Sequence, residues 1–250
     1  MIQKLILIAM IMSGGLAQAR VFNMAKESFA PYLRGTYMPV AMTDGVYSGA
    51  LGASSTAETQ MKYDASGEFG FAYGSPRLKM RFGVEYLMIP RMSENANNAS
   101  GTALYGIDSQ STVLTPKLDF EITMKTWQEG RLFLLLGGGY ANLSSKTSYA
   151  FTGAGTTQYS LADFSESMKA STIMEEAALG FEGLMSDSTT YAFEAGYRNL
   201  NFDKLSYSSS GTNFQGAFNS GDTAMNTDGS KRTLNLSNLF IGVSLRFWID

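Results

Sequence analysis

The chain ends on a stretch, Thr233–Ile249 (TLNLSNLFIGVSLRFWI), in which residue type alternates with a period of two. One set is apolar throughout: Leu239, Ile241, Val243, Leu245, Phe247 and Ile249. A period of two sends alternate side chains to opposite faces of a strand. The apolar face is long enough for a tilted strand to cross a membrane, which takes about 9–11 residues. Such a strand needs both edges paired in lipid, so we expect further strands and closure of the last onto the first.

Composition narrows the function classes. The 250 residues carry 19 Lys+Arg and 22 Asp+Glu, and this near balance does not indicate nucleic acid as a partner. The sequence has no cysteine, hence no disulfide or thiol chemistry, and no histidine. Gly (26), Phe (16) and Tyr (13) are plentiful, which suits a β protein with aromatic residues at membrane interfaces.

The N-terminus has the pattern of a secretory signal. Lys4 precedes the apolar run Leu5–Met12, and Ala17-Gln18-Ala19 supplies small residues at the cleavage positions. We therefore expect residues 1–19 to be removed and residues 20–250 to form the mature domain. The apolar run is far shorter than the roughly 20 residues of a spanning helix.

Seven further segments precede the last one and are predicted as strands, most of them because they alternate. They are Ala30–Val40, Glu68–Tyr73, Leu78–Met88, Val113–Lys125, Arg131–Asn142, Met168–Met185 and Thr190–Leu200. Pro116 interrupts one of them and suggests a bulge there. Arg131–Asn142 starts apolar on both faces, but its Gly137-Gly138-Gly139 argues against a helix.

The connections between the eight predicted strands alternate long and short. The long ones are Ala41–Ser66, Pro90–Gln110, Leu143–Ser167 and Asn201–Lys231. In an antiparallel meander this order puts the long loops at one end and the tight turns and termini at the other, as in bacterial outer-membrane barrels. The fold class predicted is all-β, an eight-stranded antiparallel up-and-down transmembrane β-barrel with four long extracellular loops. Trp127 and Trp248 then fall at the periplasmic rim, where we expect an aromatic belt.

At this point the chain resembles the small eight-stranded outer-membrane barrels of OmpA/OmpX and OmpW type. The likeness covers the whole mature chain as architecture. It implies location in the bacterial outer membrane, contact with its lipid and lipopolysaccharide, and insertion by the barrel-assembly machinery. The C-terminal strand resembles that machinery's signal, with Gly242 followed by Leu245 and Phe247. It departs from the pattern in having Phe240 two residues before the glycine and in continuing past the aromatic to Asp250.

The faces predicted to point inward collect thirteen charged residues. The positive set is Arg34, Lys79, Arg81, Lys117, Arg198 and Arg246; the negative set is Glu68, Glu85, Asp119, Glu121, Glu176, Glu182 and Glu194. An eight-stranded interior is just wide enough to be filled by side chains. Because buried charges are costly unless paired, we expect a plug of ion pairs; a polar track for ions or a ligand site is the alternative.

No catalytic, metal or cofactor site is predicted. Asp119 and Glu121 point the same way and in principle suit acid–base work, but lumen salt bridges are the favoured interpretation. Hydrolases and acyltransferases resembling this architecture use a catalytic histidine, which this chain lacks. The chain is therefore expected to be a structural or surface-interacting protein rather than an enzyme.

Two other functions stay open. One is a conduit for small hydrophobic molecules, as the OmpW-like resemblance implies, for which the inward candidates are Phe133, Leu135, Phe240 and Trp248. The other is a soluble lipocalin-like barrel, which would need apolar residues inside and polar ones outside. The long loops also contain six aromatic residues. These residues either pack the loops against the barrel rim or form an adhesive or ligand-contacting surface: Tyr149, Phe151, Tyr159, Tyr207, Phe214 and Phe218.

Overall fold

The structure is a computed structural model that describes residues 28–41, 54–55, 61–127 and 129–249. The predicted signal segment 1–19 and most of the first long loop, Ala41–Ser66, lie outside the described residues. Eight long strands form the wall, and each pairs antiparallel with its neighbours. They are β1 (Phe29–Ala41), β3 (Met61–Gly74), β4 (Leu78–Met88), β6 (Ala103–Trp127), β7 (Gly130–Phe151), β8 (Phe164–Ser186), β9 (Thr189–Asn199) and β15 (Asn238–Phe247).

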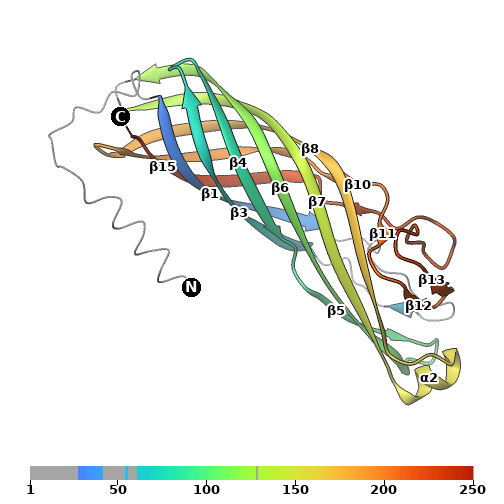
Figure 1. The fold of residues 1–250 in the computed structure, drawn as a ribbon. Helices are drawn as coiled ribbons and strands as arrows, with labels where there is room; N and C mark the ends of the chain where they lie inside the picture. Colours follow the sequence, from blue (N-terminus) through green and yellow to red (C-terminus); the bar gives the residue numbers. More distant parts are fainter. Residues whose placement is uncertain (1–27, 42–53, 56–60, 128, 250) are drawn as a thin grey trace.

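The last strand closes the ring onto the first. β15 pairs with β1 in a ladder that runs from Tyr32 opposite Arg246 to Tyr37 opposite Ile241. On its other edge β15 pairs with β9, so neither edge is left open to lipid. The predicted eight-stranded antiparallel barrel is confirmed, and the strands run side by side as a tilted wall (Figure 1).

The register fixes the tilt of the wall. Following paired residues from Tyr37 through β15 and β9 leads to Leu179 on β8. Following them the other way, through β3, β4, β6 and β7, leads to Lys169 on the same strand. The two paths meet β8 ten residues apart, which is the shear of the barrel. A shear of this size over eight strands corresponds to a tilt of about 40°.

Side chains that face outward between the two rims are apolar. Leu33, Phe69, Phe82, Leu118 and Ile241 are all well exposed, while the residues next to them in sequence are buried, except the half-buried Gly83. A surface of this kind is stable in hydrocarbon and would be costly in water. The barrel is therefore a transmembrane one. Among the described residues, no helix is long and apolar enough to cross a membrane.

A ring of tyrosines marks the outer edge of the apolar band. Because the shear is ten over eight strands, two residues paired on adjacent strands differ in height along the barrel axis by about 1.25 residues. Corrected for this difference, four outward tyrosines lie within about one residue of a common height: Tyr37, Tyr86, Tyr140 and Tyr197, each about half exposed. Aromatic girdles of this kind flank the apolar band of membrane barrels.

The opposite girdle lies at the end with the tight turns. Its outward members include Phe29, Phe71, Trp127, Phe181 and Phe247, and Trp127 stacks on Phe181 with ring centroids 5.7 Å apart. Eight residues of β1 separate Phe29 from Tyr37, which at this tilt is about 20 Å along the axis. The predicted place of Trp248 in this belt is wrong. Phe247 faces out, so the alternation turns Trp248 inward, where it is 3% exposed.

Three strands run far beyond the tyrosine ring. β6, β7 and β8 have 25, 22 and 23 residues, against 10 to 14 for the other five. The segments Pro90–Gln110 and Leu143–Ser167, expected as loops, are largely β-structure that continues the wall. Pro116 makes no bulge, because the β6–β7 register is the same on both sides of it. The bulge in β6 lies between Thr123 and Lys125 instead.

Short elements complete this outer part, which we call the head. They are β2 (Ser54–Ser55), β5 (Met92–Asn97), α2 (Gly153–Tyr159), β10 (Asn201–Phe202), β11 (Ser206–Tyr207), β12 (Gly211–Asn213), β13 (Gly216–Phe218) and β14 (Leu234–Asn235). β5 extends the sheet beside β6, and β11 pairs with β8. Figure 1 shows β6 to β8 running on to α2, at the far end from the C-terminus.

Candidate functional site

The interior changes character at the tyrosine ring. All thirteen charged side chains predicted to face inward are buried, and their ladder positions place them between the two girdles. Beyond the ring, the interior holds apolar residues such as Met38, Leu87, Val113, Leu143 and Leu200. It also holds buried hydroxyls that bond one another, Ser109 with Thr147 and Ser111 with Ser145. The barrel thus has a charged lumen within the membrane and a largely apolar core in the head.

Arg131 is a further lumen charge that the sequence analysis missed. It is 1% exposed and sits at the start of β7. The next residues, Leu132–Leu136, are apolar on both faces, and the sequence analysis named only Phe133 and Leu135 as inward candidates there. Arg131 lies two residues before the inward-facing Phe133, and this spacing predicts that Arg131 faces inward too. With Arg131 included, seven cations face seven carboxylates. Asp64 on β3, which the sequence analysis also missed, is an eighth carboxylate and is buried near the level of the tyrosine ring.

At the end with the tight turns, two arginines form ion pairs with two glutamates. Arg246 donates to Glu121 at 2.5 Å and to Glu182 at 3.0 Å. Arg131 donates through Nε to Glu182 at 2.7 Å and also binds Glu121. Thr190 adds a hydroxyl to Glu182 at 2.5 Å. These contacts join β6, β7, β8, β9 and β15 across the lumen.

In the middle of the lumen, Arg34 and Arg81 share Glu194, each with a nitrogen 2.7 Å from one of its oxygens. Arg34 also contacts Glu68 at 2.9 Å, and Arg81 contacts Glu121 at 3.2 Å. Glu194 lies on β9, which is separated by one strand from β1, the strand of Arg34, and by three strands from β4, the strand of Arg81. The Arg81–Glu194 pair therefore crosses the lumen, and Arg34 joins the same carboxylate from a nearby part of the wall.

Near the tyrosine ring, Lys117 is surrounded by four carboxylates. Its Nζ lies 2.6 Å from Glu176, 3.1 Å from Glu68, and 3.6 Å from both Glu85 and Asp119. Arg198 closes this layer, at 2.7 Å from Glu85 and 3.2 Å from Glu176. Desolvation costs several kcal/mol for an unpaired ion, so this degree of pairing is what allows the charges to stay buried.

The candidate residues for an apolar track are buried, but cations cover their rings. The guanidinium carbons of Arg131 and Arg246 lie 4.9 and 5.5 Å from the Phe133 ring centroid. Those of Arg34 and Arg198 lie 5.1 and 5.5 Å from that of Phe240. Lys79 sits 4.2 Å from the Trp248 ring centroid, and Leu135 is fully buried. The aromatic faces therefore stabilise charge and form no continuous apolar path.

The triple glycine Gly137–Gly139 leaves space for side chains of the neighbouring strand that pack against its backbone. A Cβ added at Gly137 would come within 1.9 Å of the Asp119 carboxylate, and one at Gly139 within 2.7 Å of Thr115. The side chains that cross the bare backbone thus come from β6. Packing at this distance requires glycine.

The head has a buried ion pair of its own, which the sequence analysis also missed. Glu166 on β8 accepts from Arg232 at 2.6 and 3.1 Å. Tyr149, Tyr207 and Asn213 also donate to this carboxylate. Burial and the neighbouring Glu166 raise the pKa of the Tyr149 phenol well above its ordinary value. The cluster ties the segment 201–236 down onto β7 and β8.

The aromatic residues expected in the loops are packed together. Tyr105, Tyr149, Phe151, Tyr159, Phe164 and Phe214 form a continuous set with ring centroids 4.6 to 6.2 Å apart. Tyr207 stacks on Phe218 separately at 4.0 Å. Their contacts are with one another and with the sheet, so they build the core of the head.

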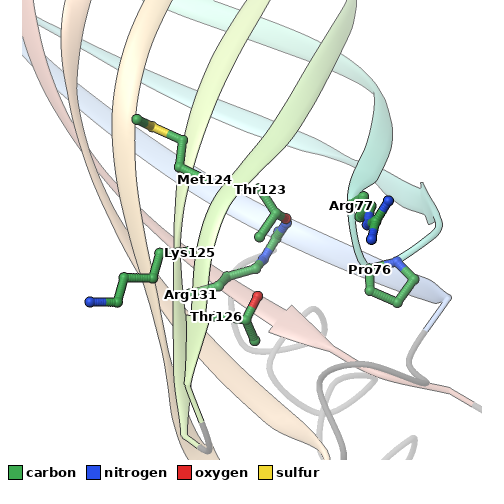
Figure 2. Close-up of a pocket in the computed structure, with 7 residues that line it drawn as sticks. All are labelled: Pro76, Arg77, Thr123, Met124, Lys125, Thr126 and Arg131. Carbon is green, nitrogen blue, oxygen red and sulfur yellow. The ribbon is translucent and has the colours of Figure 1, made fainter.

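A small pocket opens at the rim with the tight turns, with a cavity volume of about 330 Å³ (Figure 2). Its lining is Pro76, Arg77, Thr123, Met124, Lys125, Thr126 and Arg131. The bulge in β6 turns Thr123 and Thr126 toward Arg131, and Lys125 points away from Arg77 in this view. Since Glu121 and Glu182 already neutralise Arg131, we assign this pocket no ligand. Within the described residues, no group of three or more acidic side chains is placed to hold a metal ion.

The ring of eight strands and its apolar outer face define the class: a small transmembrane β-barrel. No protein-family model matches the chain, and no curated protein does. Among solved structures, Neisserial surface protein A is similar at 11% identity, over 88% of this chain and 97% of that one, with a TM-score of 0.38. The outer membrane protein OprG from Pseudomonas aeruginosa is similar at 14% identity, over 90% and 99%, with a TM-score of 0.42. A major outer membrane protein from Thermus thermophilus is similar at 11%, over 88% and 99%, with a TM-score of 0.47. The class follows from the strands and faces of this chain, not from these likenesses.

Proposed function

We propose that this protein is an integral outer-membrane barrel that is sealed inside and presents a folded head to the exterior. Its role is structural or surface-interacting, and it is not an enzyme. One observation carries the proposal: seven buried cations and eight buried carboxylates lie inside the barrel, and most of them form ion pairs with one another. A conducting pore needs a hydrated lumen, or an excess of one sign, and the paired charges favour neither.

The packing of the head also supports a sealed barrel. Leu200, Phe202, Leu205, Leu234 and Leu236 are buried in its core and come from the segment that precedes β15. This segment packs over the inner side of β6 to β8 above the charged lumen. A solute leaving the lumen would have to displace an apolar core and break the Glu166–Arg232 pair. The hydrophobic conduit is less favoured for this reason, and because cations cover Phe133 and Phe240.

Recording from the purified protein in planar bilayers tests the sealed lumen. We expect silence, or brief events of small conductance. Long-lived openings of porin size would overturn the proposal. A charge-unbalancing variant, Glu194→Ala, gives the comparison: it leaves Arg34 and Arg81 without their shared partner, so openings should become more frequent than in the parent protein if the ion pairs are the seal.

A further inference from the structure

Three lysines lie on the outward side of the head, above the tyrosine ring. Lys146 is on β7, Lys169 is on β8, and Lys204 comes two residues before Ser206, which pairs with Lys169. Lys146 pairs with Ser167, and Lys169 with Ser144, so the first two lysines are diagonal neighbours on adjacent strands. Burial alternates along these segments, with Thr147, Met168 and Leu205 inside. All three lysines are therefore exposed on the same outer side.

These cations are close to each other, and the carboxylate beside them is the exposed Asp203, which precedes Lys204 in the chain. Their ladder partners are neutral: Gln110 and Ser167 flank Lys146, while Ser144 and Ser206 flank Lys169. The exposed carboxylates on neighbouring segments already have donors. Asp108 binds Arg91, Asp163 accepts from the Phe151 amide, Glu175 from Asn199, and Asp203 from Asn201. Like charges on adjacent strands are unfavourable, so an external anion would relieve a cost built into the fold.

The height of the lysines above the tyrosine ring indicates which membrane anion can reach them. Six residues of β7 separate Lys146 from Tyr140 of the tyrosine ring, which at the barrel tilt is about 15 Å along the axis. Corrected for the shear, Lys169 lies at nearly the same height. This is beyond the acyl chains and within the headgroup layer of a large membrane glycolipid. Serine and threonine hydroxyls surround the lysines on this face (Thr112, Ser144, Ser167, Ser171), and they suit sugar hydroxyls and phosphate oxygens.

We propose that Lys146, Lys169 and Lys204 bind the phosphate groups of a phosphorylated glycolipid of the outer leaflet. Clustered basic residues at a membrane surface attract anionic headgroups in this way. The proposal rests on the proposed function, in that the head must stand on the outer side. It adds a ligand class and a site to the wall of that head.

Binding to the protein in lipid nanodiscs tests it, with purified lipopolysaccharide as the probe and the same lipid with its phosphates removed as the comparison. The variant Lys146→Gln/Lys169→Gln/Lys204→Gln should bind the phosphorylated lipid at least tenfold more weakly than the parent. The matched variant Arg77→Gln/Lys125→Gln/Lys231→Gln removes the same charge elsewhere and should bind like the parent. The dephosphorylated lipid should bind the parent as weakly as the triple variant binds the intact lipid.

Equal binding by the two variants would overturn the proposal, as would equal binding of the two lipids by the parent. Full displacement of the lipid by millimolar inorganic phosphate would also overturn it, because the site would then recognise a small free anion. Lysine-to-arginine replacements at the three positions keep the charge and should restore binding, which excludes misfolding as the cause of a loss. The planar-bilayer experiment is independent of these lysines, so failure of the site and failure of the sealed barrel are distinguishable.

Discussion

Arg232 and Glu166 form a two-pronged ion pair inside the head, with nitrogen–oxygen distances of 2.6 and 3.1 Å. The two residues are 66 positions apart in the chain and are both almost fully buried among apolar side chains. The pair joins the segment before β15 to the long strand β8. It therefore fixes the segment before β15 against the wall of the head.

Arg232→Ala should loosen the head while leaving the membrane part assembled. Removal of Arg232 leaves the Glu166 carboxylate buried without its cation, which should lower the stability of the head by about 3–5 kcal/mol. Protease added to intact cells should then cut within residues 201–236 much faster than in the parent. The double variant Glu166→Leu/Arg232→Met removes both charges and should resist cleavage more than the single one. Equal cleavage of parent and single variant would show that the pair does not hold the head.

Glu121→Gln should destabilise the barrel. Glu121 contacts Arg81, Arg131 and Arg246, so its neutralisation leaves three buried cations with less compensation, costing about 3–5 kcal/mol. Urea unfolding of the refolded protein, followed by gel mobility of folded and unfolded forms, measures this change. The control is Glu129→Gln, at an exposed residue between β6 and β7, where we expect a change within about 0.5 kcal/mol. The same loss in both variants would contradict the network's role.

Gly137→Ala should cost about 1–3 kcal/mol, because the added Cβ overlaps the carboxylate and the Cβ of Asp119. Asp119 is too short to swing clear, so the lumen packing must shift. Gly67 is a matched control in the wall of β3, since a Cβ built there meets nothing within 4 Å. Unfolding in urea should separate the two variants. If Gly67→Ala proves as damaging as Gly137→Ala, close packing in the lumen is not the reason for the triple glycine.

Deletion of Phe247–Asp250 should abolish outer-membrane assembly. The deletion removes the last ladder residue, Phe247, which pairs with Thr189, and the buried Trp248. It also truncates the predicted assembly signal formed with Gly242 and Leu245. Fractionation of membranes should then find the protein degraded or in the periplasm. Removal of Asp250 alone is the control and should leave assembly intact; normal insertion of the longer deletion would count against the signal.

Epitope tags test which end of the barrel faces outside. A tag inserted in the turn between Asn98 and Gly101 lies on the head and should be detected on intact cells. A tag in the turn between β8 and β9, at Asp187, should be detected only after permeabilisation. The reverse pattern would invert the topology, and would also remove the basis of the proposed glycolipid site.

The strand faces were determined by the sequence alone. Side-chain direction along a strand depends only on local period, so alternation identified the apolar outer face and placed all thirteen predicted charges inside. The same rule located eight strands and the closing role of the C-terminal stretch. The sequence analysis did not extend the inward side of Phe133 back by two residues to Arg131. It also misplaced Trp248 in the outward belt, although its inward direction follows from Phe247 facing out.

Only the tertiary structure decided heights and long-range contacts. The common level of Tyr37, Tyr86, Tyr140 and Tyr197 depends on the shear of the closed ring, which no single strand specifies. The head was expected as loops because its inner face is covered by residues distant in the chain, such as Arg232 and Leu234. Its polar, serine-rich strands bury one side only when that segment folds back. Pairing partners in the lumen follow from the same closure, since they meet across the axis.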